Sequence, residues 1–400
     1  MSRAQEQPVR LLAIIPALGI AQIVSWGSLF YAIAVLAEPV RRTLGLGSVE
    51  AFAGFSIALG ISGLMSPFSG RLIDAHGGRL VLSLGALNAA AALVILATAV
   101  NFPMLLAGWC LVGVAMSMTL YDPAFAALGA IAGSRYRQAI TALTLIAGFS
   151  STVFWPLTHA LESWCGWRNT LLLFALLHVV VALPLVWLLV PPRERPKTSI
   201  APAGQKSPAM SSARSLHGRI WLAACFTLAS FVFSSMSAHL VGLMNLKGLT
   251  IDQAVTVLSL VGPMQVTGRL LEMSLGRRLT LRTLGTLTFS VLVAALALLA
   301  FVPGMGVAAF VFVIVYGGAN GVYTIVRGVL PETLYGRERL GSLLGWLARP
   351  QYVAQAVAPA AVAFLLRALP ANHVIILLCA AEAASLGCFL WAVRVANHPH

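Results

Sequence analysis

The chain has 400 residues, of which 59% are hydrophobic and only 10% are charged, and its mean hydropathy is +0.89. A soluble globular protein carries about a quarter charged residues and needs polar side chains on its surface, so this composition excludes a soluble domain. The formal net charge of +14 does not indicate a nucleic-acid partner, because the basic residues lie in short gaps between apolar runs, where membrane proteins place them.

In chain order, the apolar runs predict an all-α integral membrane protein with about twelve transmembrane helices. A span needs about 20 mostly apolar residues, and runs this long must be helical to satisfy their backbone polar groups. The first run is too long for the core of a signal peptide, so we interpret it as a retained helix. The predicted spans lie near residues 11–37, 50–70, 80–100, 102–128, 139–160, 167–190, 219–245, 252–271, 282–302, 304–328, 341–366 and 372–395.

A segment rich in Pro, Ser, Ala and basic residues separates the sixth and seventh spans and is typical of a flexible cytoplasmic linker. It predicts an N-terminal six-helix bundle at 1–190, a linker at 191–218 and a C-terminal six-helix bundle at 219–400. The five cysteines show neither metal-ligand spacing nor a disulfide pattern. We expect no cofactor and no metal.

The Lys and Arg distribution predicts the orientation in the membrane. If the N-terminus is cytoplasmic, the gaps after the even-numbered spans should be basic, and these gaps hold most of the loop arginines. The opposite gaps hold only Arg41, Arg42, Arg168, Lys247 and Arg367. Both termini are therefore predicted to be cytoplasmic.

An internal repeat links the two halves. After the second span the chain reads GRLIDAHGGR (residues 70–79), and after the eighth it reads GRLLEMSLGR (residues 268–277). Gly, Arg, Leu, an acid, Gly and Arg recur in register, and each segment follows a helix that contains a proline, Pro67 or Pro263. Matching loops at matching places indicate duplicated halves, which are common in transporters.

At these residues the sequence resembles the major facilitator superfamily, whose signature between helices two and three is G-x-x-x-D-R-x-G-R-R. Gly70, Asp74, Gly77 and Arg79 match it, whereas the residues at 75 and 78 depart from it. The CGWR segment at 165–168 also looks like the GWR found in the family at the start of helix six.

The resemblance implies alternating access between two rocking bundles. Spans 1, 4, 7 and 10 would line a central cavity, spans 2, 5, 8 and 11 would form the bundle interface, and spans 3, 6, 9 and 12 would face lipid. The loop acid of the family helps to close the cytoplasmic side. This role carries over to Asp74, with Arg349 as a candidate partner. In the second half the counterparts are Gly268, Glu272 and Arg277, with Arg135 or Arg137 as the partner of Glu272; charge that only sets the topology is the alternative.

Ionisable residues inside spans are costly and mark functional sites. Asp122 in span four and Arg327 in span ten lie in equivalent cavity helices, where they fit a gate that a substrate or proton opens. Arg327 also suits direct binding of an anionic substrate. Alternatively, Asp122 caps the kink before Pro123 and Arg327 snorkels to the interface.

Further candidates have the chemistry of a cavity lining. Histidine ordinarily titrates near neutral pH, so His239 in span seven fits a proton path, or else a buried hydrogen-bonded histidine. Aromatic and amide groups suit an amphipathic solute; those on the cavity helices are Gln22, Trp26, Tyr31, Asn320 and Tyr323. His159, His178 and Glu382 are weaker candidates, because their spans are assigned to the interface or to lipid.

Together these features predict a monomeric secondary transporter of a small organic solute in the bacterial inner membrane, coupled to protons and favouring organic anions. A proton-antiport multidrug efflux pump is the alternative, and Asp122 would favour its lipophilic cations. The chain has no HExxH, GxSxG or P-loop motif, so an enzyme is not expected. A solute sensor on a transporter scaffold is also disfavoured, because no signalling domain is appended.

Overall fold

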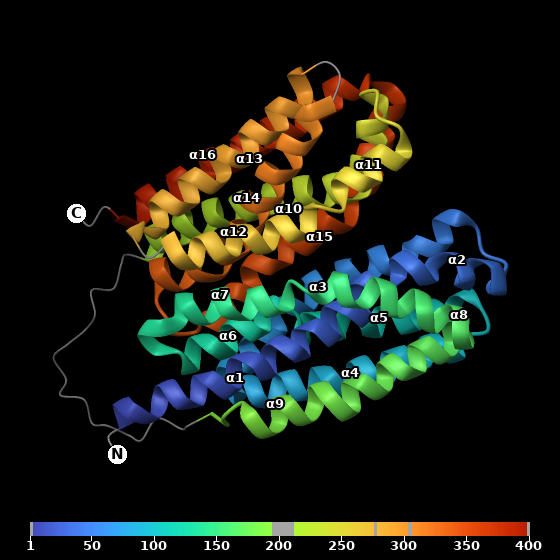
Figure 1. The fold of residues 1–400 in the computed structure, drawn as a ribbon. Coiled ribbons are helices and arrows are strands. Elements are labelled where there is room, and N and C mark those ends of the chain that lie inside the picture. Colours follow the sequence, from blue (N-terminus) through green and yellow to red (C-terminus); the bar gives the residue numbers. More distant parts are fainter. Residues whose placement is uncertain (1–2, 194–211, 276–277, 303–305, 398–400) are drawn as a thin grey trace.

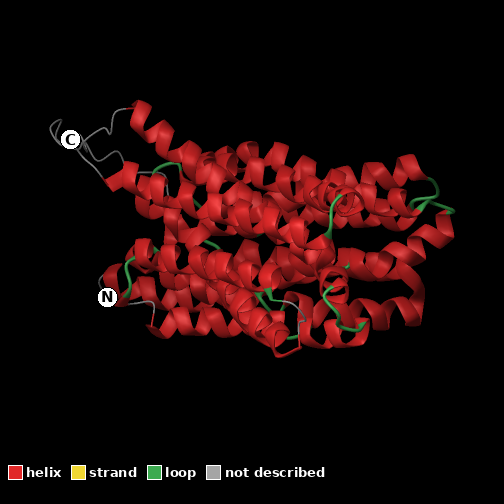
Figure 2. Ribbon diagram, turned by 90° about the horizontal axis from the view of Figure 1, so that it is seen from above, coloured by secondary structure: helices red, strands yellow, loops and turns green. Residues whose placement is uncertain are grey.

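A computed structural model describes residues 3–193, 212–275, 278–302 and 306–397. All regular structure in these residues is helical, and the long helices run side by side (Figure 2). The N-terminal half contains α1 (Arg3–Trp26), η1 (Gly27–Tyr31), α2 (Ile33–Leu44), α3 (Ser48–His76), α4 (Gly78–Thr98), α5 (Phe102–Thr119), α6 (Tyr121–Ile131), η2 (Gly133–Arg135), α7 (Tyr136–Ala147), α8 (Ser150–Leu177), η3 (His178–Ala182) and α9 (Leu183–Leu189). The C-terminal half contains α10 (Ser212–Leu246), α11 (Ile251–Leu258), α12 (Val261–Leu275), α13 (Leu281–Phe301), α14 (Gly306–Tyr335), α15 (Leu340–Ala368) and α16 (Ala371–Asn397).

The described residues of the twelve predicted spans lie mainly on helices, in two six-helix bundles, and the two bundles are seen in Figure 1. By length and hydropathy, nine stretches of the described residues can cross a membrane, and one of them, 133–189, holds both the fifth and the sixth span. Within it the helix breaks at Gly166, whose φ of +79° is accessible to glycine at little cost. Helices α3 and α15 are not among the nine stretches, and these two helices pack against each other between the bundles.

Glycines allow the bundles to approach closely. A Cβ on Gly70 of α3 would lie 2.0 Å from the carbonyl oxygen of Gly341 of α15, and one on Gly345 would lie 2.2 Å from that of Ser66. Helix α7 likewise packs on α12. Close packing of small residues is how membrane helices associate, since lipid supplies no hydrophobic driving force between them. The predicted bundle interface of spans 2, 5, 8 and 11 is therefore confirmed.

The outer helices expose large apolar side chains, as a lipid-facing surface requires. On α4 these include Leu84 and Leu87, and on α13 they include Leu287 and Val291. The chain is thus a multi-pass membrane protein, with its outer surface formed in part by α4 and α13.

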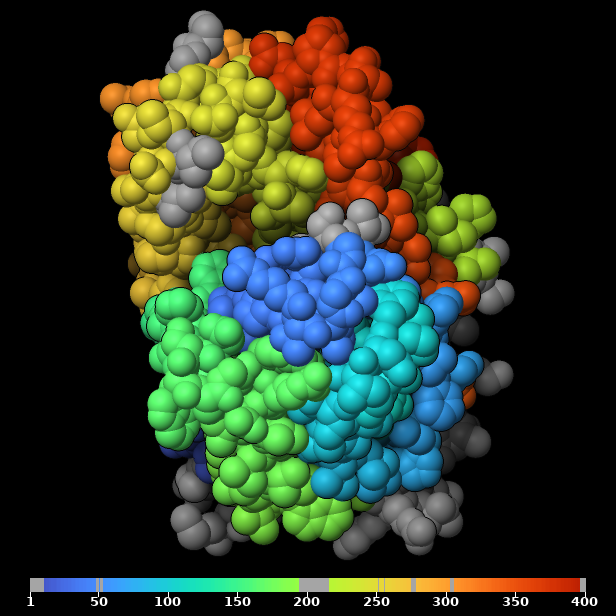
Figure 3. Space-filling model, turned by 90° about the vertical axis from the view of Figure 1, so that its right-hand side faces the viewer, coloured from blue at the N-terminus to red at the C-terminus, as the bar shows by residue number. Residues whose placement is uncertain are grey.

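The described chain begins and ends at the same end of the molecule (Figure 1), which we call the termini side. Helix α10 begins at Ser212, inside the predicted linker of 191–218, and most of that linker lies outside the described residues. The opposite end is formed by α2, the turn within α8 and α11, and Figure 3 looks onto this end.

Candidate substrate and gating site

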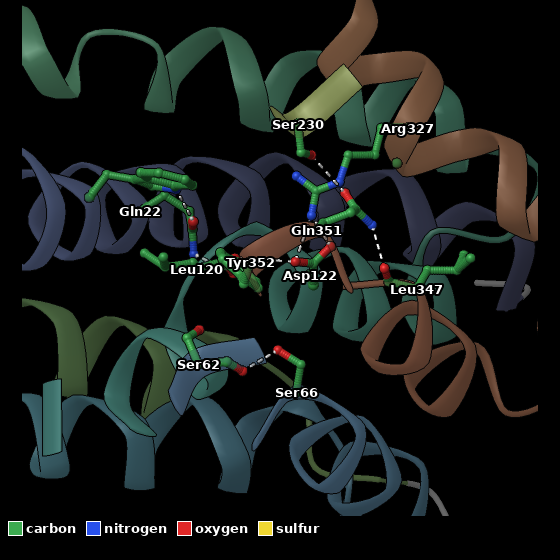
Figure 4. Close-up of polar contacts among 12 residues, drawn as sticks. Gln22, Ser62, Ser66, Leu120, Asp122, Ser230, Arg327, Leu347, Gln351 and Tyr352 are labelled. Atoms are coloured by element: carbon green, nitrogen blue, oxygen red, sulfur yellow. Dashed lines mark hydrogen bonds and ion pairs between the residues drawn. The ribbon is translucent and has the colours of Figure 1, made fainter. Parts of the chain in front are cut away.

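An ion pair joins the two bundles near the middle of the fold. Asp122 lies in the first turn of α6, and Arg327 lies on α14. The Nη2 atom of Arg327 is 2.6 Å from Oδ1 and 2.7 Å from Oδ2 of Asp122 (Figure 4). The Tyr352 hydroxyl of α15 donates a third hydrogen bond to this carboxylate at 3.3 Å. Asp122 and Arg327 therefore face each other as the sequence indicated. Both charged side chains are largely buried, which excludes snorkelling of Arg327 to the membrane surface.

Further contacts around this ion pair hold α14 against the N-terminal bundle. The Tyr136 hydroxyl of α7 donates to the carbonyl oxygen of Gly328, 3.0 Å away. A Cβ on Gly328 would lie 2.7 Å from the ring of Phe125 of α6, so this glycine allows α14 to approach the N-terminal bundle. The bundles are therefore locked together around Asp122 and Arg327.

Gln22, Trp26 and Tyr31 line the N-terminal side of the central region. The Gln22 amide donates to the backbone oxygens of Thr119 and Leu120, where α5 gives way to α6, and it accepts from the Trp26 indole at 3.2 Å. These rings belong to an aromatic cluster of Trp26, Phe30, Tyr31, Tyr121 and Trp155. The cluster draws together α1, η1, α6 and α8, so it provides an apolar wall with two phenolic hydroxyl groups.

The candidates on the C-terminal side are less closely grouped. Asn320 and Tyr323 lie on α14, on the stripe that continues to Arg327, but the Asn320 amide donates to its own helix at Tyr316. His239 bonds the carbonyl oxygen of Pro359 at 2.8 Å, which ties α10 to α15 within one bundle. That contact fits the hydrogen bond of the alternative prediction for His239, although the side chain is only partly buried.

The loop acid Asp74 closes the termini side by capping a helix. Its carboxylate accepts from the Gly341 and Ser342 amides at 2.9 and 2.7 Å and from the Ser342 hydroxyl at 2.5 Å. These groups form the first turn of α15, where the helix dipole favours negative charge. The prediction that Arg349 is the partner of Asp74 is wrong. Its backbone packs on Gly63, which is eleven residues before Asp74 and thus about 16 Å away along α3.

The equivalent acid in the second half does find an arginine. Glu272 of α12 accepts from Arg137 Nε at 2.8 Å and from the Thr141 hydroxyl at 2.9 Å, both on α7. Of the two predicted partners, the structure selects Arg137, and Arg135 is exposed. Gly268 packs within its own half, where its Cβ would lie 2.2 Å from the Gly318 carbonyl oxygen. Arg277 lies outside the described residues.

The remaining motif residues shape the turn between α3 and α4. Gly77 has φ +88°, which favours glycine. The Arg79 guanidinium stacks over the Trp187 ring of α9 at 4.4 Å. Gly77 and Arg79 therefore have local structural roles, while Asp74 forms hydrogen bonds from one bundle to the other.

Sequence reasoning missed Arg269 because it was treated only as one position of the repeated loop motif. Arg269 is 4% exposed, and its Nε and Nη1 atoms have no hydrogen-bond partner among the described residues. It reaches from α12 to the break between α7 and α8, where a Cβ on Gly148 would lie 2.2 Å from Nη1. Tyr31 and Tyr121 of the aromatic cluster are its electrostatic neighbours.

His178 was ranked low because its span was assigned to lipid, yet it is fully buried. It lies in the π-helical turn η3 and bonds the Ser28 hydroxyl of the π-helical turn η1 at 2.9 Å. Such turns often occur at functional sites. No three His, Cys, Asp or Glu side chains of the described chain gather as metal ligands.

Two six-helix bundles joined by buried ion pairs define a membrane transporter fold, and the comparisons agree. The sequence profile of the Major Facilitator Superfamily matches residues 18–359, so the chain belongs to this family. No curated protein sequence matches the chain.

Solved structures match over nearly the whole chain at low sequence identity. FucP in the outward conformation, the E. coli fucose:proton symporter, is 13% identical with a TM-score of 0.74 and covers 96% of this chain and 99% of its own. A bacterial homologue of the iron transporter ferroportin, in an outward-facing state, is 16% identical with a TM-score of 0.75, at 95% and 99% coverage. The human organic anion transporter MFSD10 is 16% identical with a TM-score of 0.70, at 97% and 99% coverage. These similarities establish the fold.

Proposed function

We propose that this protein is a proton-coupled secondary transporter of small organic anions in the bacterial inner membrane. The observation that carries the substrate class is Arg269, a buried guanidinium between the bundles that has no acidic partner in the described chain. A charged side chain within a membrane costs at least about 2.5–3.5 kcal/mol, so an arginine held there without a counter-charge has the character of a ligand-binding group.

The charge balance at the bundle interface supports an anion over a cation. Asp122 is neutralised by Arg327, and Glu272 by Arg137, so neither acid is free for a cationic substrate. Beside these two ion pairs, Arg269 is a positive charge without an acidic partner in the described chain. A carboxylate suits the planar guanidinium fork, and the aromatic cluster, which includes the hydroxyl groups of Tyr31 and Tyr121, offers an apolar wall in the same electrostatic environment.

The bonds between the bundles support alternating access. In the described chain they lie from the termini side to the middle: Asp74 with α15, Glu272 with Arg137, and Asp122 with Arg327. We assign the termini side to the cytoplasm from the basic loops, so the state described is closed toward the cytoplasm. Transport then requires these bonds to break in turn as the bundles rock. The outward states named for two similar folds are consistent with this assignment.

A binding experiment tests the substrate class. The thermal unfolding midpoint of the detergent-purified protein is measured with acetate, malonate, succinate and benzoate, and with tetraphenylphosphonium as a lipophilic cation. A ligand at 100 times its Kd stabilises the folded state by about 2.7 kcal/mol. We expect at least one carboxylate to raise the midpoint, the effect to be lost in Arg269→Gln and partly kept in Arg269→Lys.

The control is Arg282→Gln, which removes an exposed arginine from α13 and should leave anion stabilisation intact. Proteoliposomes then show whether the stabilising anion accumulates when a pH gradient is imposed. Stabilisation by carboxylates that persists in Arg269→Gln would refute the assignment of Arg269. Stabilisation by the cation alone, lost in Asp122→Asn, would favour the multidrug efflux alternative.

A further inference from the structure

Glu382 is a buried acid on a helix whose position in the family would place it against lipid. It lies on α16, is 1% exposed, and its Oε1 atom has no hydrogen-bond partner among the described residues. The side chain points into the C-terminal bundle. There it borders a small crevice with Phe233 of α10, Leu292 of α13, and Asn320 and Tyr323 of α14. Both α10 and α14 are helices assigned to the central cavity.

No positive charge faces this carboxyl group in the described part of the bundle. The titratable groups around it are Tyr316 and Tyr323 of α14, Cys225 of α10 and Cys379 of its own helix, while α13 contributes only apolar contacts. An unpaired carboxylate in such surroundings loses its hydration without compensation, so the neutral acid is the stable form there. Burial and the lack of a partner therefore favour the neutral, protonated form of Glu382 in this packing.

Helix α14 connects this acid to the ion pair between the bundles. Tyr316, Asn320, Tyr323 and Arg327 follow one another at four-, three- and four-residue spacing, so they share one face of the helix. Asn320 borders Glu382, and Arg327 binds Asp122 roughly 10 Å further along the axis. A charge appearing at Glu382 would thus act on the helix that holds the gate.

We propose that Glu382 is the proton-carrying residue of this transporter. When the bundle rearranges and water reaches the crevice, the carboxyl O–H bond breaks, the proton passes to water and a carboxylate remains. Reprotonation restores the neutral acid and the packing seen here. The proposal rests on the proposed function for its proton coupling, but not on the identity of the anion.

Infrared spectroscopy of the purified protein tests the protonation state directly. At neutral pH the wild type should show the carbonyl stretching band of a protonated carboxylic acid. That band should be lost in Glu382→Gln, which keeps the shape of the neutral acid. It should be retained in Glu382→Asp and in the control Glu338→Gln, which removes an exposed acid from the loop before α15. A band unchanged in Glu382→Gln overturns the proposal.

A distance measurement tests the coupling to conformation. Spin labels at Trp164 and Leu246, both exposed at the end opposite the termini, report the separation of the bundles in a chain whose native cysteines have been replaced. Raising the pH from mildly acidic to alkaline should shift the distance distribution of the wild type and of Glu338→Gln. Glu382→Gln should keep the acidic distribution throughout, and a wild-type response in that variant overturns the proposal.

Neither readout uses a substrate. If no carboxylate binds but Glu382→Gln abolishes both responses, the proposed anion class fails and the proton site stands. If carboxylates bind through Arg269 but Glu382→Gln titrates like the wild type, the proton site fails and the substrate class stands.

Discussion

The ion pair between Asp122 and Arg327 gives a quantitative prediction about the bundle interface. The side chains are 7% and 12% exposed, and they meet at 2.6 and 2.7 Å. Replacing one partner by an amide leaves the other charge buried, with only Tyr352 to assist the carboxylate. Breaking a buried pair in this way costs about 3–5 kcal/mol. Replacing both removes both charges, so the coupling energy between the two substitutions should be about 2–3 kcal/mol.

Thermal unfolding of four proteins measures this coupling: the wild type, Asp122→Asn, Arg327→Gln and the double variant. At roughly 2 °C per kcal/mol for a large domain, each single variant should lose roughly 6–10 °C. The double variant should lose clearly less than the sum of the two. Glu338→Gln serves as the control, because this acid is exposed in the loop before α15 and its replacement should leave the midpoint nearly unchanged. Additive losses at Asp122 and Arg327 would refute the reasoning.

Three further predictions concern the loops and the interface. Gly70→Ala would place a Cβ 2.0 Å from a backbone oxygen of α15 and should cost about 1–3 kcal/mol, whereas Gly60→Ala on the same helix meets nothing within 4 Å and should leave the unfolding midpoint unchanged. Asp74→Ala removes the cap of α15 and should cost about 0.5–2 kcal/mol, and a wild-type unfolding midpoint in this variant would contradict the capping role. Hydrogen bonds from Arg41, which contributes most, and from Arg42 lower the pKa of Glu38 to about 2 from its ordinary value of 4.5. The stability they give is present above pH 4.5 and lost as the pH falls toward 2, so the midpoint of the wild type should fall more steeply in that window than that of Glu38→Gln.

Much of the fold was predictable because membrane helices are encoded by long apolar runs. The pairing of Asp122 with Arg327 was also predictable, since each is an isolated charge in an equivalent helix. The pairing of Asp74 with Arg349 failed for a physical reason. Sequence alone does not give the register between α3 and α15, and glycine contacts set that register so that Asp74 meets the start of α15.

The acid Glu382 shows where family-level reasoning loses information. Assigning a helix to lipid describes only one of its faces, because the opposite face must pack on its own bundle. On α16 the buried face contains Glu382 and Ser385, and the hydroxyl of Ser385 donates to the Cys225 carbonyl oxygen of α10. The helix is apolar enough to pass as wholly lipid-facing, so its one acid was discounted. Only the rotation of α16 about its axis, which packing fixes, shows that the acid points inward.

Arg269 and Glu382 together form a consistent charge system. Both are buried, and neither has an ion-pair partner in the described chain, whereas Asp122 and Glu272 are each paired across the bundle interface. A lone cation between the bundles suits a substrate that brings its own negative charge, and a lone acid within one bundle suits a proton that brings a positive one. A bound anion at Arg269 or a proton on Glu382 would relieve the cost of burying each group, so loading a site should favour the state in which it is buried. Under the proposed function Arg269 would bind the anion and Glu382 would carry the proton, and their separation within the fold allows each to be removed without the other.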